Sequence, residues 1–218
     1  TEKGKEALPA DKILVTVGRK PNSDQMNFSK IGVKLDARGF IQVDKQLRTS
    51  VPHIFAIGDI AGQPMLAHKA SREGIIAAEV IAGKNVVMDV KVIPAVIFTD
   101  PEIAAVGMTR EEAEKAGFET MVGQFPYAAN GRALSVQEPE GFIKIVANKK
   151  NKVVLGVHIV GFDASNLISE AALAIEMGAT LDDIAGTIHP HPTLGEIMME
   201  SAEATLGHPI HIFLRPER

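Results

Sequence analysis

The spacing of apolar and polar residues changes near residue 89. Before it, the run KILVTVG at residues 12–18 is almost continuously apolar and predicts a buried strand that stops at the turn-prone RKPNSD. IGVKLD (31–36) and GFIQVD (39–44) alternate apolar with polar residues around a glycine, as in a hairpin with one buried face. HIFAIGD (53–59) is a further predicted strand. Apolar spacing after Pro64 predicts a helix that ends at Gly83.

After residue 89, the pattern alternates between strands and short helices. Two strands are predicted at VIPAVIFT and EIAAVGM, and a hairpin is predicted at GFIKIVAN and KVVLGVHIV. Capping boxes at Thr109-x-x-Glu112 and Thr180-x-x-Asp183 predict two short helices. Longer helices are predicted at 165–177 and 194–206, and the first of these is expected to face the core or a second subunit. The fold class is therefore an incomplete α/β portion followed by an α+β domain with flanking helices.

Composition limits the kinds of partner. The chain has 218 residues, of which 45% are hydrophobic and 23% charged, with a net charge of −4. Because no basic stripe is present, nucleic acid is not an expected partner. No apolar stretch approaches the roughly 20 residues that span a bilayer, so no membrane insertion is expected. The first residue is not methionine and no signal core follows, which favours a piece of a longer protein.

The first candidate site is AIGD at residues 56–59, where a predicted strand ends shortly before a predicted helix. The Asp59 carboxylate can accept sugar-type hydroxyls, and the glycine before it lets the backbone approach a ligand closely. Backbone N–H groups near the helix start, at Met65, Leu66 and Ala67, present positive potential to an electron-rich group. This combination suits a nucleotide cofactor. The alternative is that Asp59 only forms a turn and caps the helix.

The second candidate site is HPHPTLGE at residues 189–196. Prolines on both sides of His191 present its imidazole from a stiff, non-helical segment. Glu196 follows in the first turn of a predicted helix, where its carboxylate could bond one ring nitrogen and fix the tautomer while the other nitrogen faces substrate. Two alternatives remain open. Thr193-x-x-Glu196 is also a capping box, and His191 could be a hydrogen-bonded interface residue.

Weaker features allow more than one interpretation. Arg19, in GRKPN, suits either a phosphate contact or a solvated turn. The polar loop FPYAANGRAL has no chemistry that its sequence reveals. Histidines are numerous enough for zinc near the end of the chain, but their spacing matches no helical i, i+4 pair, so no metal site is predicted; these histidines are His189, His191, His208 and His211.

Five motifs occur in one order along most of the chain: TVGRKPN, AIGD, PMLAHKASREG, FTDPEIAAVGMT and HPHPTLGE. Together they resemble the pyridine nucleotide–disulfide oxidoreductase family. PMLAHKA and HPHPTLGE look most like its dihydrolipoamide dehydrogenase branch, rather than the glutathione- or mercury-reducing branches. The resemblance assigns residues 1–21 to the end of a nicotinamide-binding domain, 22–89 to the C-terminal part of the FAD-binding and central region, and 90–218 to a dimerisation domain.

The same resemblance implies FAD and NAD as cofactors. It places Asp59 at a ribityl hydroxyl of FAD, Gly18 and Arg19 near the junction of the nicotinamide- and flavin-binding parts, and His68 beside the flavin. It also places a short stretch of backbone at the flavin pyrimidine edge, namely Met65, Leu66 and Ala67.

For HPHPTLGE, the resemblance selects His191 and Glu196 as an acid–base pair. It leaves His189 as a supporting residue and implies a cis peptide bond between His191 and Pro192. In the implied reaction, His191 takes a proton from a dihydrolipoyl dithiol, the thiolate attacks an enzyme disulfide, and the flavin passes hydride to NAD. The histidine would act across the interface of a homodimer.

The implied partners are a lipoyl-bearing acyltransferase of a 2-oxoacid dehydrogenase complex or the carrier protein of glycine cleavage. The expected location is the cytoplasm of a bacterium or the mitochondrial matrix of a eukaryote. The chain departs from the family because it lacks cysteine, the flavin fingerprint G-x-G-x-x-G and most of a nicotinamide-binding domain. We therefore expect this chain alone to be inactive. The alternatives are another flavin disulfide reductase of glutathione or mercury type, or a non-enzymatic module that dimerises or docks.

Overall fold

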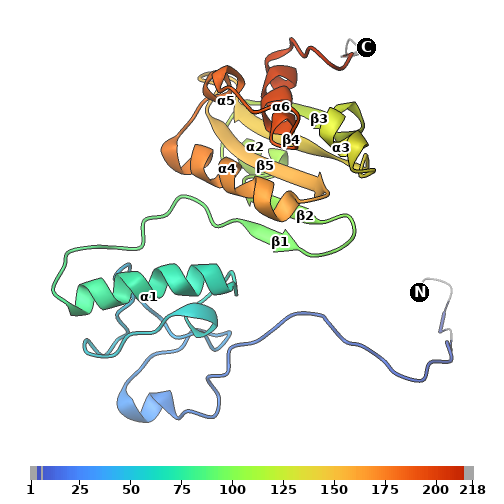
Figure 1. Ribbon diagram of the computed structural model, residues 1–218. Coiled ribbons are helices and arrows are strands. Elements are labelled where there is room, and N and C mark those ends of the chain that lie inside the picture. The colour runs from blue at the N-terminus through green and yellow to red at the C-terminus, as the bar shows by residue number, and fades with distance from the viewer. Residues whose placement is uncertain (1–3, 6, 214–218) are drawn as a thin grey trace. The chain divides into compact units, whose positions relative to one another are not determined.

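The computed structural model describes residues 4–5 and 7–213, which separate into two compact units (Figure 1). The division falls between Met88 and Asp89, next to the change of pattern in the sequence. The functional assignment of the ranges 1–21, 22–89 and 90–218 stays a prediction. Each unit has its own buried apolar cluster, so each is described separately.

The first unit is built around one long helix, as predicted after Pro64. Helix α1 spans Ala67–Ile81 and packs Ile76 and Val80 against Leu47. The other regular elements among its described residues are two short 3-10 helices, η1 at Phe28–Ile31 and η2 at Gly58–Ile60.

Strand structure in this unit is sparser than the sequence predicts. The hairpin expected from residues 31–44 forms one isolated bridge, between Leu35 and Ile41. The strand expected at 53–59 forms one bridge, between Phe55 and Arg48, before the chain turns into η2. Both bridges join loops that pack around small apolar clusters, and neither belongs to a sheet.

The predicted buried strand at residues 12–18 is wrong. The segment forms no strand, and its large apolar side chains are each at least 70% exposed: Ile13, Leu14, Val15 and Val17. A central strand needs neighbours for its backbone N–H and C=O groups, and the described residues of this unit provide no strand beside it. The apolar side chains of residues 12–18 therefore favour burial, but the other described residues of this unit do not bury them.

The second unit is a five-stranded antiparallel sheet with the order β1-β2-β5-β4-β3 (Figure 1). Its strands are β1 Ala95–Ile97, β2 Ile103–Gly107, β3 Thr120–Pro126, β4 Gly141–Asn148 and β5 Val154–Gly161. The predicted hairpin of β4 and β5 is confirmed, with Ile143 opposite Ile159. Strand β3 was not predicted, because its glycine and proline disfavour strand pairing in the interior of a sheet; it is an edge strand.

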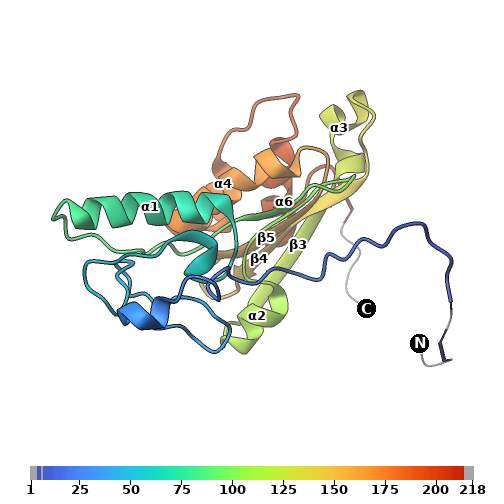
Figure 2. The same cartoon turned by 90° about the horizontal axis from the view of Figure 1, so that it is seen from below.

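Helices α4 and α6 cover one face of this sheet, and α2 lies on the other (Figures 1 and 2). The helix bounds are α2 Arg110–Lys115, α3 Gly131–Ser135, α4 Ala164–Met177, α5 Leu181–Gly186 and α6 Glu196–Leu206, with the 3-10 helix η3 at Tyr127–Ala129. The core lies between sheet and helices, where Ile143 and Ile159 belong to one cluster with Ile168 of α4 and Ile197 of α6. No helix within the described residues is long and apolar enough to cross a membrane.

Local capping fixes where the short helices begin. Both predicted capping boxes form, at Thr109 with Glu112 for α2 and at Thr180 with Asp183 for α5. Helix α6 begins at Glu196, two residues later than its predicted start at Leu194. This shift places Glu196 at the first helical position, directly after the loop that carries His191.

Candidate functional site

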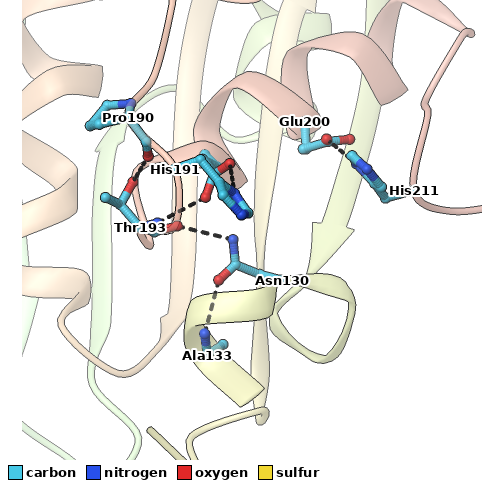
Figure 3. Close-up of polar contacts among 8 residues, drawn as sticks. Asn130, Ala133, Pro190, His191, Thr193, Glu200 and His211 are labelled. Atoms are coloured by element: carbon cyan, nitrogen blue, oxygen red, sulfur yellow. Dashed lines mark hydrogen bonds and ion pairs between the residues drawn. The ribbon is translucent and has the colours of Figure 1, made fainter. Parts of the chain in front are cut away.

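The first part of the candidate site is the contact between His191 and Glu196 (Figure 3). Nδ1 of His191 lies 2.9 Å from Oε1 of Glu196, and the peptide bond to Pro192 is cis, as the resemblance implied. Because a carboxylate oxygen only accepts, Nδ1 carries the hydrogen, and Nε2 is the acceptor of the neutral ring. The His191 side chain is 77% exposed and that of Glu196 is 17% exposed. A sheltered carboxylate thus orients an accessible base.

Glu196 uses its two carboxylate oxygens for different purposes. Oε1 accepts from His191, while Oε2 accepts from the backbone N–H of Thr193 at 2.8 Å. The Thr193 hydroxyl donates to the carbonyl of Pro190 at 2.7 Å, and the residue preceding α6 is Gly195. The predicted capping box therefore forms only in half. One oxygen of Glu196 closes the turn and the other holds His191, so both interpretations of this glutamate apply together.

The charge state of Glu196 follows from these contacts. Burial disfavours its ionised form, but hydrogen bonds from the Thr193 N–H and from His191 outweigh this effect. The charges of His191 and His211 act in the same direction as the hydrogen bonds, and the pKa of the Glu196 carboxyl lies below its usual value of 4.5. Glu196 is consequently a hydrogen-bond acceptor for His191 at neutral pH, not a proton donor.

Asn130 supports the loop that carries His191, and the sequence did not reveal this role. Its Nδ2 donates to the carbonyl of Thr193 at 3.0 Å, and its Oδ1 accepts from the N–H of Ala133 at 2.9 Å (Figure 3). Asn130 is thus both the N-cap of α3 and a link to a loop 63 residues further along the chain. An N-cap can be suspected from sequence, whereas the second contact depends on the fold.

His189 also supports this loop. Its Nδ1 lies 2.9 Å from the carbonyl of Thr187, and its Nε2 lies 2.8 Å from Oε1 of Glu170 in α4. The His189 side chain is buried, so the imidazole joins the loop to α4 from inside. The geometry agrees with a supporting residue, and it adds Glu170, which no motif in the sequence indicated.

A cavity of about 290 Å³ adjoins the histidine–glutamate pair. Its size admits several water molecules. It is lined by Phe125, Ala129, Asn130, Gly131, His191, Glu196, Glu200 and His211. A larger cavity of about 530 Å³ elsewhere in the unit is mainly apolar in lining and contains none of the predicted site residues, so the smaller cavity is the better candidate.

In the first unit, a buried ion pair fixes the predicted Gly-Asp turn. Nζ of Lys69 lies 2.9 Å from Oε1 of Glu73, and both side chains are buried. Oε2 of Glu73 accepts from the N–H of Gly58 at 2.6 Å, and Lys69 donates to the carbonyl of Gly62 at 3.2 Å. Gly58 has a φ of 74°, which favours glycine. These contacts hold the turn while the Asp59 side chain stays partly exposed.

The start of α1 offers fewer donors than predicted. Met65 donates its N–H to Oε1 of Gln63 at 3.2 Å, and Leu66 donates to the carbonyl of Pro64 at 3.0 Å. Ala67 is the first helical residue, and its N–H has no acceptor within the helix. The N-cap residue of α1 is Leu66, whose side chain makes no cap hydrogen bond.

Arg19 joins this group of residues. Its guanidinium lies 3.2 Å from Oδ2 of Asp59 and donates to the carbonyl of Met65. Arg19 and Asp59 are both exposed, so their ion pair adds little stability, but it brings a cation and a carboxylate to the start of α1. Gly18 precedes it with a φ of 123°, and His68 is the second residue of α1. Within the described residues, no group of histidine and carboxylate side chains is arranged to hold a metal ion.

The second unit contains an antiparallel sheet with helices on both faces and a histidine oriented by a glutamate, and its fold is similar to that of a flavoprotein disulfide reductase of known structure. Residues 93–202 match the dimerisation domain of pyridine nucleotide-disulphide oxidoreductases, and residues 1–74 match the pyridine nucleotide-disulphide oxidoreductase domain. The chain belongs to the pyridine nucleotide-disulphide oxidoreductase family. The resemblance inferred from its motifs is confirmed.

Curated relatives sharpen this assignment. The chain is 53% identical to a dihydrolipoyl dehydrogenase of Geobacillus stearothermophilus over 96% of this chain and 45% of that protein. It is 54% identical to a dihydrolipoyl dehydrogenase of Haloferax volcanii over 99% of this chain and 46% of that protein. The chain therefore spans about half the length of the curated relatives it matches.

Solved structures show the same fold. LpdA from Mycobacterium tuberculosis superposes with a TM-score of 0.79 at 31% identity, covering 86% of this chain and 41% of that one. An HOCl-induced flavoprotein disulfide reductase from Escherichia coli gives a TM-score of 0.78 at 25% identity, covering 86% and 43%. The predicted fold class is confirmed, including the antiparallel sheet of the dimerisation domain.

Proposed function

We propose that this chain is part of a dihydrolipoyl dehydrogenase, which oxidises protein-bound dihydrolipoamide and reduces NAD through a disulfide and FAD. The observation that carries the proposal is the contact between Glu196 and His191, which leaves an exposed ring nitrogen as a base. Similarity to dihydrolipoyl dehydrogenases over nearly the whole chain supports this choice of substrate class.

His191 is the proposed acid–base residue. Its Nε2 accepts a proton from a dihydrolipoyl thiol, and the thiolate then attacks a disulfide that other residues supply, since this chain contains no cysteine. Glu196, ionised at neutral pH, stabilises the resulting imidazolium through Nδ1. Asn130 and His189 keep the loop in place so that the ring does not reorient when it gains charge.

The first unit fits part of an FAD site. Asp59 presents a partly exposed carboxylate to ribityl hydroxyls, Arg19 adds a cation, and Ala67 adds the N–H of a helix start. Gly18 and His68 are predicted neighbours of this site. When bound, FAD supplies the electron transfer to NAD that no side chain of this chain can perform.

In the proposed homodimer, which forms through the dimerisation domain, His191 acts across the interface between the subunits. The matched dimerisation domain supports this arrangement, and the exposed imidazole is accessible to a second subunit. A lipoyl-bearing acyltransferase, or the carrier protein of glycine cleavage, is the proposed protein partner. The cytoplasm of a bacterium or the mitochondrial matrix of a eukaryote is the proposed location.

Replacement of His191 by glutamine tests the function. In the full-length protein of which we propose this chain to be a part, H191Q should slow flavin reduction by dihydrolipoamide by roughly two or more orders of magnitude. The matched control is H208Q, because His208 contacts Glu203 at the end of α6 but does not line the cavity beside His191. Unchanged flavin reduction in H191Q would overturn the proposed role.

The absence of cysteine favours a different role for the chain when it is expressed alone. It would then act only as a module that dimerises or docks, and it should not reduce NAD with dihydrolipoamide. Activity of this chain alone, at catalytic rates and without added flavoprotein, would contradict that expectation. In the full-length protein, preference for oxidised glutathione or mercuric ion over dihydrolipoamide would instead favour the glutathione- or mercury-reducing branches.

A further inference from the structure

A second histidine–carboxylate pair lies beside the first. Nδ1 of His211 lies 2.5 Å from Oε1 of Glu200 (Figure 3). Both residues line the cavity that is also lined by His191 and Glu196. Glu200 follows Glu196 by four residues in α6, so the two carboxylates project from the same face of the helix, one turn apart. The chain after α6 thus turns back and brings His211 to the candidate site.

Glu200 brings a buried carboxylate to this cavity. Its side chain is 5% exposed, and its second oxygen, Oε2, is buried without a hydrogen-bond partner among the described residues. A buried carboxylate is costly unless a cation or hydrogen bonds compensate it, and His211 is the partner that compensates one oxygen of Glu200. The neighbouring group in the same cavity is the pair of His191 and Glu196.

We propose that Glu200 and His211 are positioning residues of this site, a second pair whose charges set the pH range in which His191 accepts a proton. The inference rests on the proposed function, in which His191 is the base. It goes beyond that function because Glu200 and His211 tune the proton transfer that His191 and Glu196 carry out.

The two charges of the second pair act in opposite directions. The Glu200 carboxylate makes the potential in the cavity more negative, which favours a proton on His191, whereas a proton on His211 makes it more positive. The influence of His211 reaches the first pair, because its charge contributes to the lowered pKa of Glu196. The ionisable groups that face the cavity are His191, Glu196, Glu200 and His211. The lining residues from β3, η3 and α3 carry no titratable side chain: Phe125, Ala129, Asn130 and Gly131.

The test is the pH profile of flavin reduction by dihydrolipoamide in the full-length protein. H211Q leaves the Glu200 carboxylate without its cation, so the acid limb should move to higher pH. E200Q removes the anion and should move this limb to lower pH. Each shift should be roughly 0.3–1 pH unit, as for charges a helical turn apart in a partly solvated site. The double variant E200Q/H211Q should lie near the unmodified protein.

Opposite shifts are a readout that a structural role would not produce. If both variants only lower the rate by the same factor at every pH, or leave the profile in place, the inference is wrong. His211 is largely exposed, so H211Q remains informative if E200Q does not fold. H208Q is the matched control, since it alters a similar pair outside the cavity and should not shift the profile.

H191Q, measured in parallel, separates the two proposals. A large loss of rate in H191Q together with unshifted profiles in H211Q and E200Q would contradict only the positioning role. An unchanged rate in H191Q would contradict the proposed function itself.

Discussion

Oε1 of Glu170 lies 2.8 Å from Nε2 of His189, a contact that joins helix α4 to the segment that presents His191. The other ring nitrogen of His189 lies 2.9 Å from the carbonyl oxygen of Thr187. Both ring nitrogens therefore face oxygen atoms, so the imidazole is held at two points. The contact is sheltered by the burial of the imidazole.

We predict that E170A slows the His191-dependent step on the order of tenfold, because the loop that orients His191 loses its link to α4. E170Q should retain most of the rate, since its side-chain amide can donate to the Nε2 of a neutral His189. Flavin reduction by dihydrolipoamide, measured by rapid mixing in the full-length protein, gives the rate. Equal loss in both variants would argue against a positioning contact.

The lowered pKa of Glu196 predicts a pH dependence of stability that E196Q lacks. Its carboxylate is favoured in the folded state, so its contribution is complete above the usual pKa of 4.5 and is lost as the pH falls through the lower folded pKa. The difference in free energy of unfolding between the unmodified protein and E196Q should therefore be constant near neutral pH and shrink below 4.5. Urea titrations at several pH values measure this difference. A difference that does not fall in acid would contradict the prediction.

The sequence predicts most of the second unit because its elements carry local signals. The capping boxes at Thr109 and Thr180 each define a helix start, and alternation in β4 and β5 defines a hairpin. The strand predicted at residues 12–18 fails for the opposite reason. Strand formation depends on neighbours, and a pattern of apolar residues does not show whether the same chain provides them.

The candidate site likewise contains one contact that the sequence predicts and others that depend on the fold. His191 and Glu196 are five residues apart and recognisable as a motif, and their contact forms. Glu170, Asn130 and His211 join the site through contacts across the fold, over separations of 19, 63 and 11 residues. No local motif in the sequence marks these contacts, because they form only when the sheet and helices bring the three side chains to their partners.

The close approach of α6 to strand β3 leads to a stability prediction. A Cβ at Gly123 would lie 2.5 Å from Oγ1 and 2.6 Å from Cα of Thr205, so α6 would have to move. G123A should destabilise the protein by about 1–3 kcal/mol, as overpacking of a core does. The control is G186A at the end of α5, where nothing lies within 4 Å of the added Cβ and where about 0.4–1 kcal/mol of stabilisation is expected. Urea unfolding compares the two, and equal effects would contradict the packing argument.

The buried pair of Lys69 and Glu73 should matter more for the Gly58–Asp59 turn than the exposed contact of Glu79, near the end of α1, with Lys84 beyond the helix. K69M leaves the Glu73 carboxylate buried without its cation, which should cost about 3–5 kcal/mol and loosen the Gly58–Asp59 turn. K84M, which breaks the exposed contact with Glu79, should cost about 0–1 kcal/mol.

The flavin-to-protein absorbance ratio of the purified full-length variants measures the consequence for the proposed FAD site. It should fall in K69M and stay unchanged in K84M. The double variant K69M/E73L separates charge from turn geometry. It should recover stability, because no charge is left buried without a partner, but not flavin content, because Gly58 still lacks the acceptor for its N–H. Full flavin content in the double variant would show that Glu73 does not hold the turn for the cofactor.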